Sequence, residues 1–403
     1  MNNILVIGAG SVGALMGASL FKAGLKITFA GKPNSDYTKQ LKNKGLQLSC
    51  ANSESLWISP SHPRVKFVDT ATDLSEKFEI IIVAVKSNNL SKVAFYIKAH
   101  SNPDTILIHA QNGIPYWWFN NDNYLSTLDE NLFDKLSSHR YLNTVDSNGI
   151  LQKNLGDRTI VGCVVKAPCQ RTKQGKIQVN KPPRLILGLT KSDRHNLKQQ
   201  TIQSLCDTFS QHGIAATYTD KIRAAVCNKL ALNIITNVLS ALTGRVIGDL
   251  TTNYHTNSLI ETVIAEANHI FCCYGIKPED LPTEQAIYAY IKTPGSQSHL
   301  PSLAQDFSQR KPGEVSLITA PVEMAEIAQL KVPTLFSLSE LLKICQTYSL
   351  KNHNGKPYIL TIDHSANCYM LTDDLCQSNL VDKWQISNLQ AHLAQVNVSA
   401  LNN

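Results

Sequence analysis

A glycine motif near the start of the chain constrains the fold more than any other feature. A short run of branched aliphatic residues, Ile4–Ile7, leads directly into the motif, and an apolar pattern of helical period then continues to Ala23. The motif consists of Gly8, Ala9, Gly10, Ser11, Val12 and Gly13. In a G-x-G-x-x-G turn the first glycine permits a tight turn, the second lets a pyrophosphate approach the backbone, and the third lets the helix pack closely on the sheet. The order strand, turn, helix therefore predicts a Rossmann-type dinucleotide site with the phosphates at the helix N-terminus.

Two lysines bear on which dinucleotide binds. About 20 residues after the motif, NAD-binding domains normally offer an acidic side chain to the ribose hydroxyls, whereas this chain has Lys32. A cation there suits a 2′-phosphate, so Lys32 predicts NADPH, the alternative being an ordinary exposed lysine. Lys86 directly follows the apolar run 80–85. The carboxyl ends of strands are where open α/β sheets bind ligands, so Lys86 is a second candidate, with a surface lysine as its alternative.

Short apolar runs alternate with polar or helical stretches over the first half of the chain, which predicts a mostly parallel, doubly wound sheet. These runs span residues 4–7, 27–30, 80–85, 105–108 and 159–165. After Tyr218 the sequence changes to long helix-compatible segments. We therefore expect an α/β fold with a Rossmann-type doubly wound sheet and a second, all-helical C-terminal domain. The expected division is a Rossmann domain at residues 1–218 with an irregular insertion at about 115–155, a helical domain at 219–350, and a C-terminal extension at 351–403 to which the sequence assigns no role.

The composition fits a soluble globular enzyme. Hydrophobic residues make up 43% and charged residues 17% of the 403 residues, and the net charge of +7 is spread thinly. Small anionic ligands are therefore favoured over nucleic acid. The ten cysteines form no C-x-x-C pair, which favours reduced thiols and a cytoplasmic location. We expect no metal site, because the 12 histidines form no H-E-x-x-H pattern, and no membrane span, because no later stretch reaches about 18 apolar residues.

One apolar segment carries a narrow polar stripe. At 100° per residue its members fall at roughly 0°, 40°, −20°, 80° and 20° around a helix axis. They are Lys229, Asn233, Thr236, Asn237 and Ser240. The stripe is either the solvent face of an amphipathic helix or the lining of a cleft. Asn, Thr and Ser compete with the helix backbone for hydrogen bonds, so we favour the cleft, with Lys229 as its ionisable group.

Two further residues could complete the site. Ser302 followed by Gln305 fits a capping box at a helix N-terminus, and a substrate carboxylate could dock at the same place. Glu314 follows the turn sequence Lys311-Pro312-Gly313. The chemistry of the sequence alone would leave Glu314 unremarked, because a glutamate after a turn is usually a solvated helix start.

In their order and spacing these motifs resemble the ketopantoate reductases of pantothenate biosynthesis, over roughly residues 1–345. The residues that carry the resemblance are the glycine motif, Val85-Lys86-Ser87, Gln111-Asn112-Gly113, Lys229 with Asn233 and Asn237, and Ser302 with Gln305, Asp306 and Glu314. The resemblance implies NADPH-dependent reduction of 2-dehydropantoate (ketopantoate). It also implies a role for each residue: Lys229 is the general acid, Asn112 and Asn233 position substrate and cofactor, Asn237 and Ser302 bind the substrate, Glu314 supports the lysine or the substrate hydroxyl, and Lys32 replaces an arginine at the 2′-phosphate.

On this interpretation the cofactor lies across the carboxyl ends of the strands and a 2-oxo acid binds in an interdomain cleft. The chain departs from the family pattern at His299, Val238 and Ser316. These departures keep two alternatives open, a reductase of another small 2-oxo acid and a non-catalytic NADPH-binding protein. A homodimer is compatible with the sequence.

Overall fold

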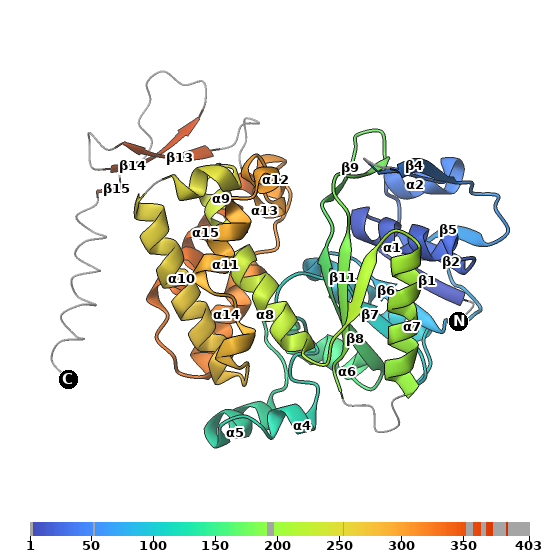
Figure 1. The fold of residues 1–403 in the computed structure, drawn as a ribbon, viewed down its shortest axis with the longest axis horizontal. Helices are drawn as coiled ribbons and strands as arrows, with labels where there is room; N and C mark the ends of the chain where they lie inside the picture. Colours follow the sequence, from blue (N-terminus) through green and yellow to red (C-terminus); the bar gives the residue numbers. More distant parts are fainter. Residues whose placement is uncertain are drawn as a thin grey trace. The chain divides into compact units, whose positions relative to one another are not determined.

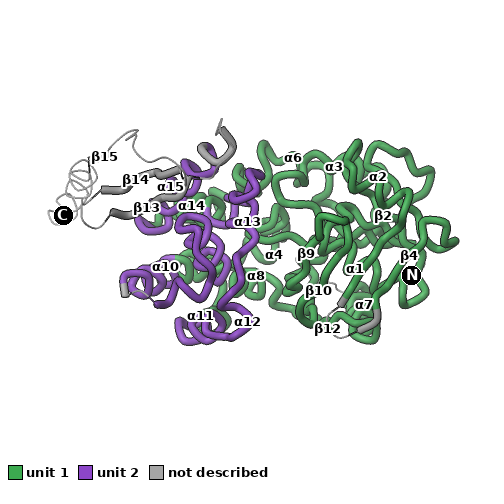
Figure 2. Tube along the Cα trace, turned by 90° about the horizontal axis from the view of Figure 1, so that it is seen from above, with its two compact units in different colours: residues 1–231, 267–282, 319–331 green, residues 232–266, 283–318, 332–403 purple. Residues whose placement is uncertain are grey.

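The computed structural model describes residues 3–50, 53–191, 197–252, 254–351, 358–363, 368–373 and 384–385 (Figure 1). By its contacts the chain forms two compact units (Figure 2). Unit 1 comprises residues 1–231, 267–282 and 319–331, and unit 2 comprises residues 232–266, 283–318 and 332–403. The division into independent domains after Tyr218 stays a prediction, because contact density does not measure independent folding.

Unit 1 contains an eight-stranded sheet in the order β12-β11-β8-β7-β6-β1-β2-β5. Its strands are β1 (Asn3–Ile7), β2 (Lys26–Gly31), β5 (Val65–Asp69), β6 (Ile80–Val83), β7 (Ile106–His109), β8 (Thr159–Lys166), β11 (Arg184–Leu189) and β12 (Ala215–Tyr218). Neighbouring strands are parallel except β8 and β11. The succession β5-β2-β1-β6-β7-β8 is the Rossmann strand order 3-2-1-4-5-6, so the predicted fold class is confirmed.

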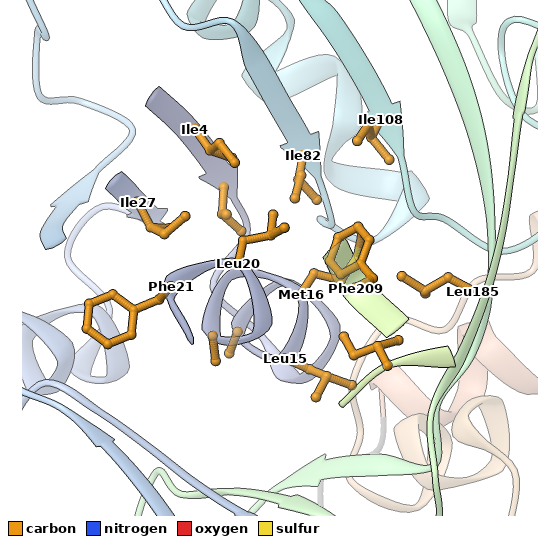
Figure 3. Close-up of a cluster of buried hydrophobic side chains, with 14 of the residues drawn as sticks. Ile4, Leu15, Met16, Leu20, Phe21, Ile27, Ile82, Ile108, Leu185 and Phe209 are labelled. Atoms are coloured by element: carbon orange, nitrogen blue, oxygen red, sulfur yellow. The ribbon is translucent and has the colours of Figure 1, made fainter. Parts of the chain in front are cut away.

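The five apolar runs became strands because they are buried by helices on the sheet. Ile4 and Ile82 are fully buried, and Figure 3 shows them beside Met16 and Leu20 of α1 (Ser11–Lys22). Phe209 of α7 (Leu197–Gln211) joins the same cluster. Each fully buried aliphatic or aromatic side chain of this kind contributes about 1.5–3 kcal/mol. The remaining helices on this part of the chain are α2 (Asp36–Lys44), α3 (Leu90–Ala99) and the 3-10 turn η1 (Ser87–Asn89).

Several strands were not predicted from the sequence. In the main sheet these are β5, β11 and β12. A second, four-stranded sheet runs β4-β3-β10-β9, formed by β3 (Leu46–Cys50), β4 (Ser53–Ile58), β9 (Cys169–Arg171) and β10 (Ile177–Val179). These strands are short, at three to six residues, and each mixes polar with apolar residues. Such segments show a weaker pattern than a fully buried parallel strand.

The stretch 115–155, predicted to be an irregular insertion, holds short helical segments joined by turns. It contains α4 (Asp122–Leu125), α5 (Glu130–Ser138), η2 (Ser147–Gly149) and α6 (Ile150–Leu155). The Asn121 and Asp129 side chains cap α4 and α5 by accepting main-chain N–H bonds. The aromatic run 116–119 that precedes them is buried. Short helices stabilised by caps and tertiary packing show little periodicity in sequence.

The stripe segment is one long helix with a π-helical turn inside it. It comprises α8 (Ile222–Asn233), the π turn η3 (Ile234–Val238) and α9 (Leu239–Thr243). By length and composition alone, Ile222–Thr243 is long and apolar enough to cross a membrane, with a mean hydropathy of 1.4 over an 18-residue window. The expected absence of a membrane span stays a prediction. However, 61% of the apolar window is buried inside the protein, as in the core helix of a soluble protein.

Unit 2 is built mainly from helices, as predicted. The helices that lie wholly in unit 2 are η4 (Ile247–Thr251), α11 (Glu284–Ile291), α12 (Pro294–Gln297), α13 (Ser302–Ser308) and α15 (Pro333–Lys351). The helices α10 (Tyr254–Cys273) and α14 (Ser316–Ile327) are shared between the units, and η5 (Pro278–Asp280) belongs to unit 1. Beyond α15, β13 (Tyr358–Asp363), β14 (Cys368–Asp373) and β15 (Trp384–Gln385) form an antiparallel sheet. Most of the predicted extension 351–403 lies outside the described residues.

Candidate active site

The three motif glycines occupy three different environments in the turn between β1 and α1. Gly8 has φ +92°, and a β-carbon on it would lie 2.8 Å from the carbonyl carbon of Ala84. A β-carbon on Gly13 would overlap the carbonyl oxygen of Gly8. Gly10, by contrast, faces open space, with no atom within 4 Å of an added β-carbon. The first and third glycines are therefore required by the protein itself, whereas the space at Gly10 fits a ligand that approaches the backbone.

The start of α1 fits an anion. Gly10 is the N-cap and offers no side chain to the first turn, and the first turn carries no acidic residue. Uncapped N–H groups and the helix dipole favour a phosphate at such a position. Ala9 is buried, while Ser11 and Val12 are partly exposed. The geometry of the six predicted motif residues is thus compatible with a dinucleotide pyrophosphate, and their binding role stays a prediction.

Lys32 and Lys86 lie on either side of this turn. Lys32 directly follows β2 and Lys86 follows β6, and these are the two strands that flank β1. Both lysines are exposed. The carbonyl oxygen of Lys32 accepts a hydrogen bond from the Thr38 hydroxyl at 2.8 Å, which fixes the backbone after β2. Both predicted cofactor lysines therefore stand at the carboxyl edge of the sheet beside the glycine turn.

Lys229 is held at the same edge of the sheet. Its Nζ donates to Asn112 Oδ1 and to the carbonyl oxygen of Val165, both at 2.6 Å. Asn112 lies just beyond β7 and Val165 near the end of β8, and the two strands are neighbours. Cys163, also on β8, stays a neutral thiol, because burial raises its pKa to about 12 against the opposing charge of Lys229. An ammonium group is thus fixed between two neutral oxygens.

A buried histidine supports the loop that carries Asn112. His109 ends β7, and its Nδ1 lies 3.3 Å from Gln111 Oε1. Since Nδ1 faces an acceptor it carries the proton, so Nε2 accepts from the Tyr116 hydroxyl at 3.1 Å. Burial lowers the pKa of His109 to about 4. The neutral imidazole therefore joins the residues on both sides of Asn112.

In unit 2, Asn237 links two other predicted residues, Asn233 and Ser302. Its Nδ2 donates to Asn233 Oδ1 at 3.3 Å, and its Oδ1 accepts from Ser302 Oγ at 3.2 Å and from the Leu303 N–H at 3.3 Å. The predicted capping box was wrong. The N-cap of α13 is Pro301, Ser302 is the first helical residue, and the Gln305 side chain donates to the carbonyl of Leu300. Asn237 takes the capping role from another helix, so the start of α13 already has an acceptor.

The solvent-face interpretation of the polar stripe was also wrong. Thr236, Asn237 and Ser240 are only 3%, 6% and 0% exposed. The Thr236 hydroxyl donates back to the carbonyl of Leu232 at 2.9 Å. The angles expected for a regular α-helix do not hold through the π turn, which has more than 3.6 residues per turn; π turns inside α-helices are frequent at functional sites.

Glu314 lies in unit 2, two residues before α14, and is partly buried. Its carbonyl oxygen accepts from the Leu317 N–H at 3.2 Å, and the preceding Gly313 N–H donates to Gln346 Oε1 at 3.0 Å. The structure thus fixes the backbone at Glu314. Its role toward Lys229 stays a prediction.

Sequence reasoning missed the acceptor of Lys229 at Val165 and the anchored arginine Arg223 on the same helix. The acceptor at Val165 is a main-chain carbonyl, which leaves no side-chain signal. Arg223 lies six residues before Lys229 on α8 and donates to the carbonyl of Trp118. An arginine on a largely apolar helix was a usable signal, but its partner is again a main-chain oxygen.

Comparisons with known proteins point to one family. Its two sequence models match the chain, ketopantoate reductase PanE/ApbA at residues 4–116 and its C-terminal model at residues 221–346. A 2-dehydropantoate 2-reductase of Mesorhizobium japonicum is 25% identical over 345 residues, which cover 84% of this chain and 96% of that protein.

Solved structures agree with this assignment. A candidate ketopantoate reductase from Ralstonia solanacearum is 26% identical with a TM-score of 0.72, covering 87% of this chain and 99% of that one. A D-mandelate dehydrogenase solved with NADH and anilino(oxo)acetate shares the fold at 17% identity, with a TM-score of 0.70 and coverage of 86% and 99%. The two family models together match more than half of the residues, and the chain belongs to the ketopantoate reductase family.

Proposed function

We propose that this protein reduces 2-dehydropantoate to pantoate with NADPH. The observation that carries the proposal is the carboxyl edge of the main sheet. Along the strand order β2-β1-β6-β7-β8, this edge presents Lys32, the glycine turn, Lys86, and Asn112 with Lys229. Neighbouring strands are about 4.8 Å apart, so a phosphate cradle and a proton donor are separated by a few strand widths, as an extended dinucleotide requires.

When bound, the nicotinamide supplies the hydride that is added to C2 of the ketone. The chain supplies the proton: the Lys229 ammonium donates it to the oxygen of the former carbonyl, so that a 2-hydroxy acid forms and the lysine becomes neutral until solvent reprotonates it. General acid help of this kind is typically worth about 10²- to 10⁴-fold. Asn112 keeps the ammonium in place through the 2.6 Å hydrogen bond.

The remaining roles belong to the same proposal. Lys32 forms an ion pair with the 2′-phosphate of NADPH, and Lys86 binds the cofactor at the end of β6. Asn233, Asn237 and Ser302 bind the substrate, and Glu314 supports Lys229 or the substrate hydroxyl. Family membership and the fold of unit 1 support these roles. A cytoplasmic location and a homodimer stay predictions.

One observation favours a different 2-oxo acid as substrate. Ser302 Oγ and the N–H of Leu303 both donate to Asn237 Oδ1, so part of the predicted substrate contact is used within the protein. The region also carries the departures His299, Val238 and Ser316. The fold is shared with a D-mandelate dehydrogenase whose structure was solved with NADH and anilino(oxo)acetate.

The deciding experiment measures oxidation of NADPH and of NADH by the purified protein with a panel of 2-oxo acids that includes 2-dehydropantoate. The highest kcat/KM with 2-dehydropantoate and NADPH supports the proposal. A higher kcat/KM with another 2-oxo acid supports the alternative. No turnover with any acid, while NADPH still binds, would favour the non-catalytic protein.

A further inference from the structure

Arg223 makes a contact network of its own on α8. Its Nε and Nη2 donate to the carbonyl oxygen of Trp118 at 3.1 and 2.9 Å, and its Nη1 donates to the carbonyl of Thr190 at 3.3 Å. Trp118 follows β7 and Thr190 follows β11. One guanidinium group therefore ties three separate parts of unit 1 together.

Aromatic rings surround the same guanidinium. Its carbon lies 4.0 Å from the ring centre of Tyr124, 5.7 Å from that of Trp117 and 5.9 Å from that of Trp118. Burial lowers the pKa of Arg223 to about 10, so the group is still charged at neutral pH. In the part of the chain that the structure describes, its hydrogen bonds go to main-chain carbonyls rather than to a carboxylate. Carbonyl dipoles and ring faces thus balance the charge.

Arg223 and Lys229 anchor one helix to one loop. They are six residues apart on α8, which is roughly 9 Å along the axis. Their acceptors Trp118 and Asn112 are also six residues apart, on the segment after β7. The buried face of α8, which includes Cys227 and Leu230, packs the helix in place. A lysine side chain has many rotamers, so Lys229 alone adds little to the precision of that placement. Two anchors fix the rotation of α8 and its position along the axis.

We propose that Arg223 is a positioning residue, which holds α8 so that the Lys229 ammonium stays on Asn112 and Val165. Its effect on turnover rests on the proposed function, but its effect on the environment of Lys229 does not. This role requires the planar guanidinium group, which donates several hydrogen bonds at once and stacks on the aromatic rings. A lysine at position 223 can do neither.

The test is Arg223→Lys, with the matched control Arg64→Lys. Arg64 also stacks on an aromatic ring, 4.8 Å from the centre of Phe21, and donates to a main-chain carbonyl at 3.2 Å. Two quantities are measured: the rate of Lys229 acylation by acetic anhydride, followed by mass spectrometry, and kcat together with the Kd for NADPH. We expect several-fold faster acylation of Lys229 in Arg223→Lys, a kcat lower by about 10²-fold as for a misplaced catalytic group, and little change in Kd. Arg64→Lys should change none of these.

Unchanged acylation of Lys229 in Arg223→Lys would overturn the proposal, even if kcat fell. The acylation assay does not require turnover, so it can be carried out even if the wild-type protein shows no reductase activity. Failure of the proposed function is therefore distinguishable from failure of the proposal for Arg223. If Arg223→Lys does not fold, Tyr124→Leu removes the nearest ring from the same guanidinium. Lys229 should likewise be acylated faster in Tyr124→Leu. An acylation rate of Lys229 equal to that of the wild-type protein would also overturn the proposal.

Discussion

At the scale of single residues, the site depends on which atoms each polar group reaches. Gly10 faces space while Gly8 and Gly13 face backbone, so three glycines in one motif meet three different demands. The glycine motif and Lys229 could be predicted because strand, turn and stripe leave patterns in sequence. The acceptor on Val165 could not, since every residue type offers the same carbonyl. That Asn237 rather than Ser302 caps α13 could not be predicted either, because Asn237 and Leu303 are 66 residues apart in sequence.

The cofactor preference is a prediction at this scale. Replacing Lys32 by alanine should raise the KM for NADPH about tenfold or more, because a charge-assisted hydrogen bond is worth about 1.5–3 kcal/mol. The KM for NADH, which lacks the 2′-phosphate, should not change. Lys39→Ala, an exposed lysine on α2, is the control. Steady-state kinetics with both cofactors decide it, and an unchanged KM for NADPH in Lys32→Ala would mean that the phosphate is held elsewhere.

At the scale of elements, the central parallel strands and the helical character of the chain after Tyr218 were predictable, and the irregularities of these elements were not. β6 and residues 4–7 of β1 are continuous apolar runs, which only a fully buried strand or helix explains. The π turn at Ile234–Val238 has no sequence signature of its own, yet it changes the direction of every later residue on the stripe. The helices α4 and α5 were missed because tertiary contacts, such as the hydrogen bond from Tyr124 to the carbonyl of Tyr274, stabilise this stretch.

Asn237 offers a test of the link between the stripe helix and α13. In Asn237→Ala the Leu303 N–H and the Ser302 hydroxyl lose their acceptor. The free energy of unfolding should fall by about 1 kcal/mol, as for loss of a helix cap. Urea denaturation followed by circular dichroism measures this. Asn233→Ala leaves the cap intact and should have a smaller effect; equal effects, or none in Asn237→Ala, would contradict the capping role.

At the scale of the whole molecule, unit 1 is assembled from three separate stretches of chain. The Tyr274 hydroxyl donates to the carbonyl of Met324 and Lys135 donates to that of Ile327, each at about 3 Å. Both bonds join stretches that are far apart in sequence. Hydrophobic periodicity reports local structure, so it predicts helices after Tyr218 but not the unit to which the ends of α10 and α14 belong.

The C-terminal extension gives a prediction at this scale. The family match ends at residue 346, and the predicted catalytic and binding residues all precede it. A chain truncated after Lys351 should therefore stay folded and keep most of its turnover. Circular dichroism and the NADPH assay check both expectations. Loss of turnover in a folded truncated protein would show that the extension contributes to the site or to an interface.

The central claim is that Lys229 donates the proton, and Lys229→Ala tests it most directly. Removal of a general acid should lower kcat by at least about 10²-fold. The Kd for NADPH should hardly change, because the glycine turn and Lys32 lie on other elements. Lys221→Ala is the matched control. Lys221 is an exposed lysine directly before the same helix, and it forms a salt bridge with Asp280. With folding verified by circular dichroism, we predict a large loss of kcat in Lys229→Ala alone. Near-normal turnover in that variant would contradict the account.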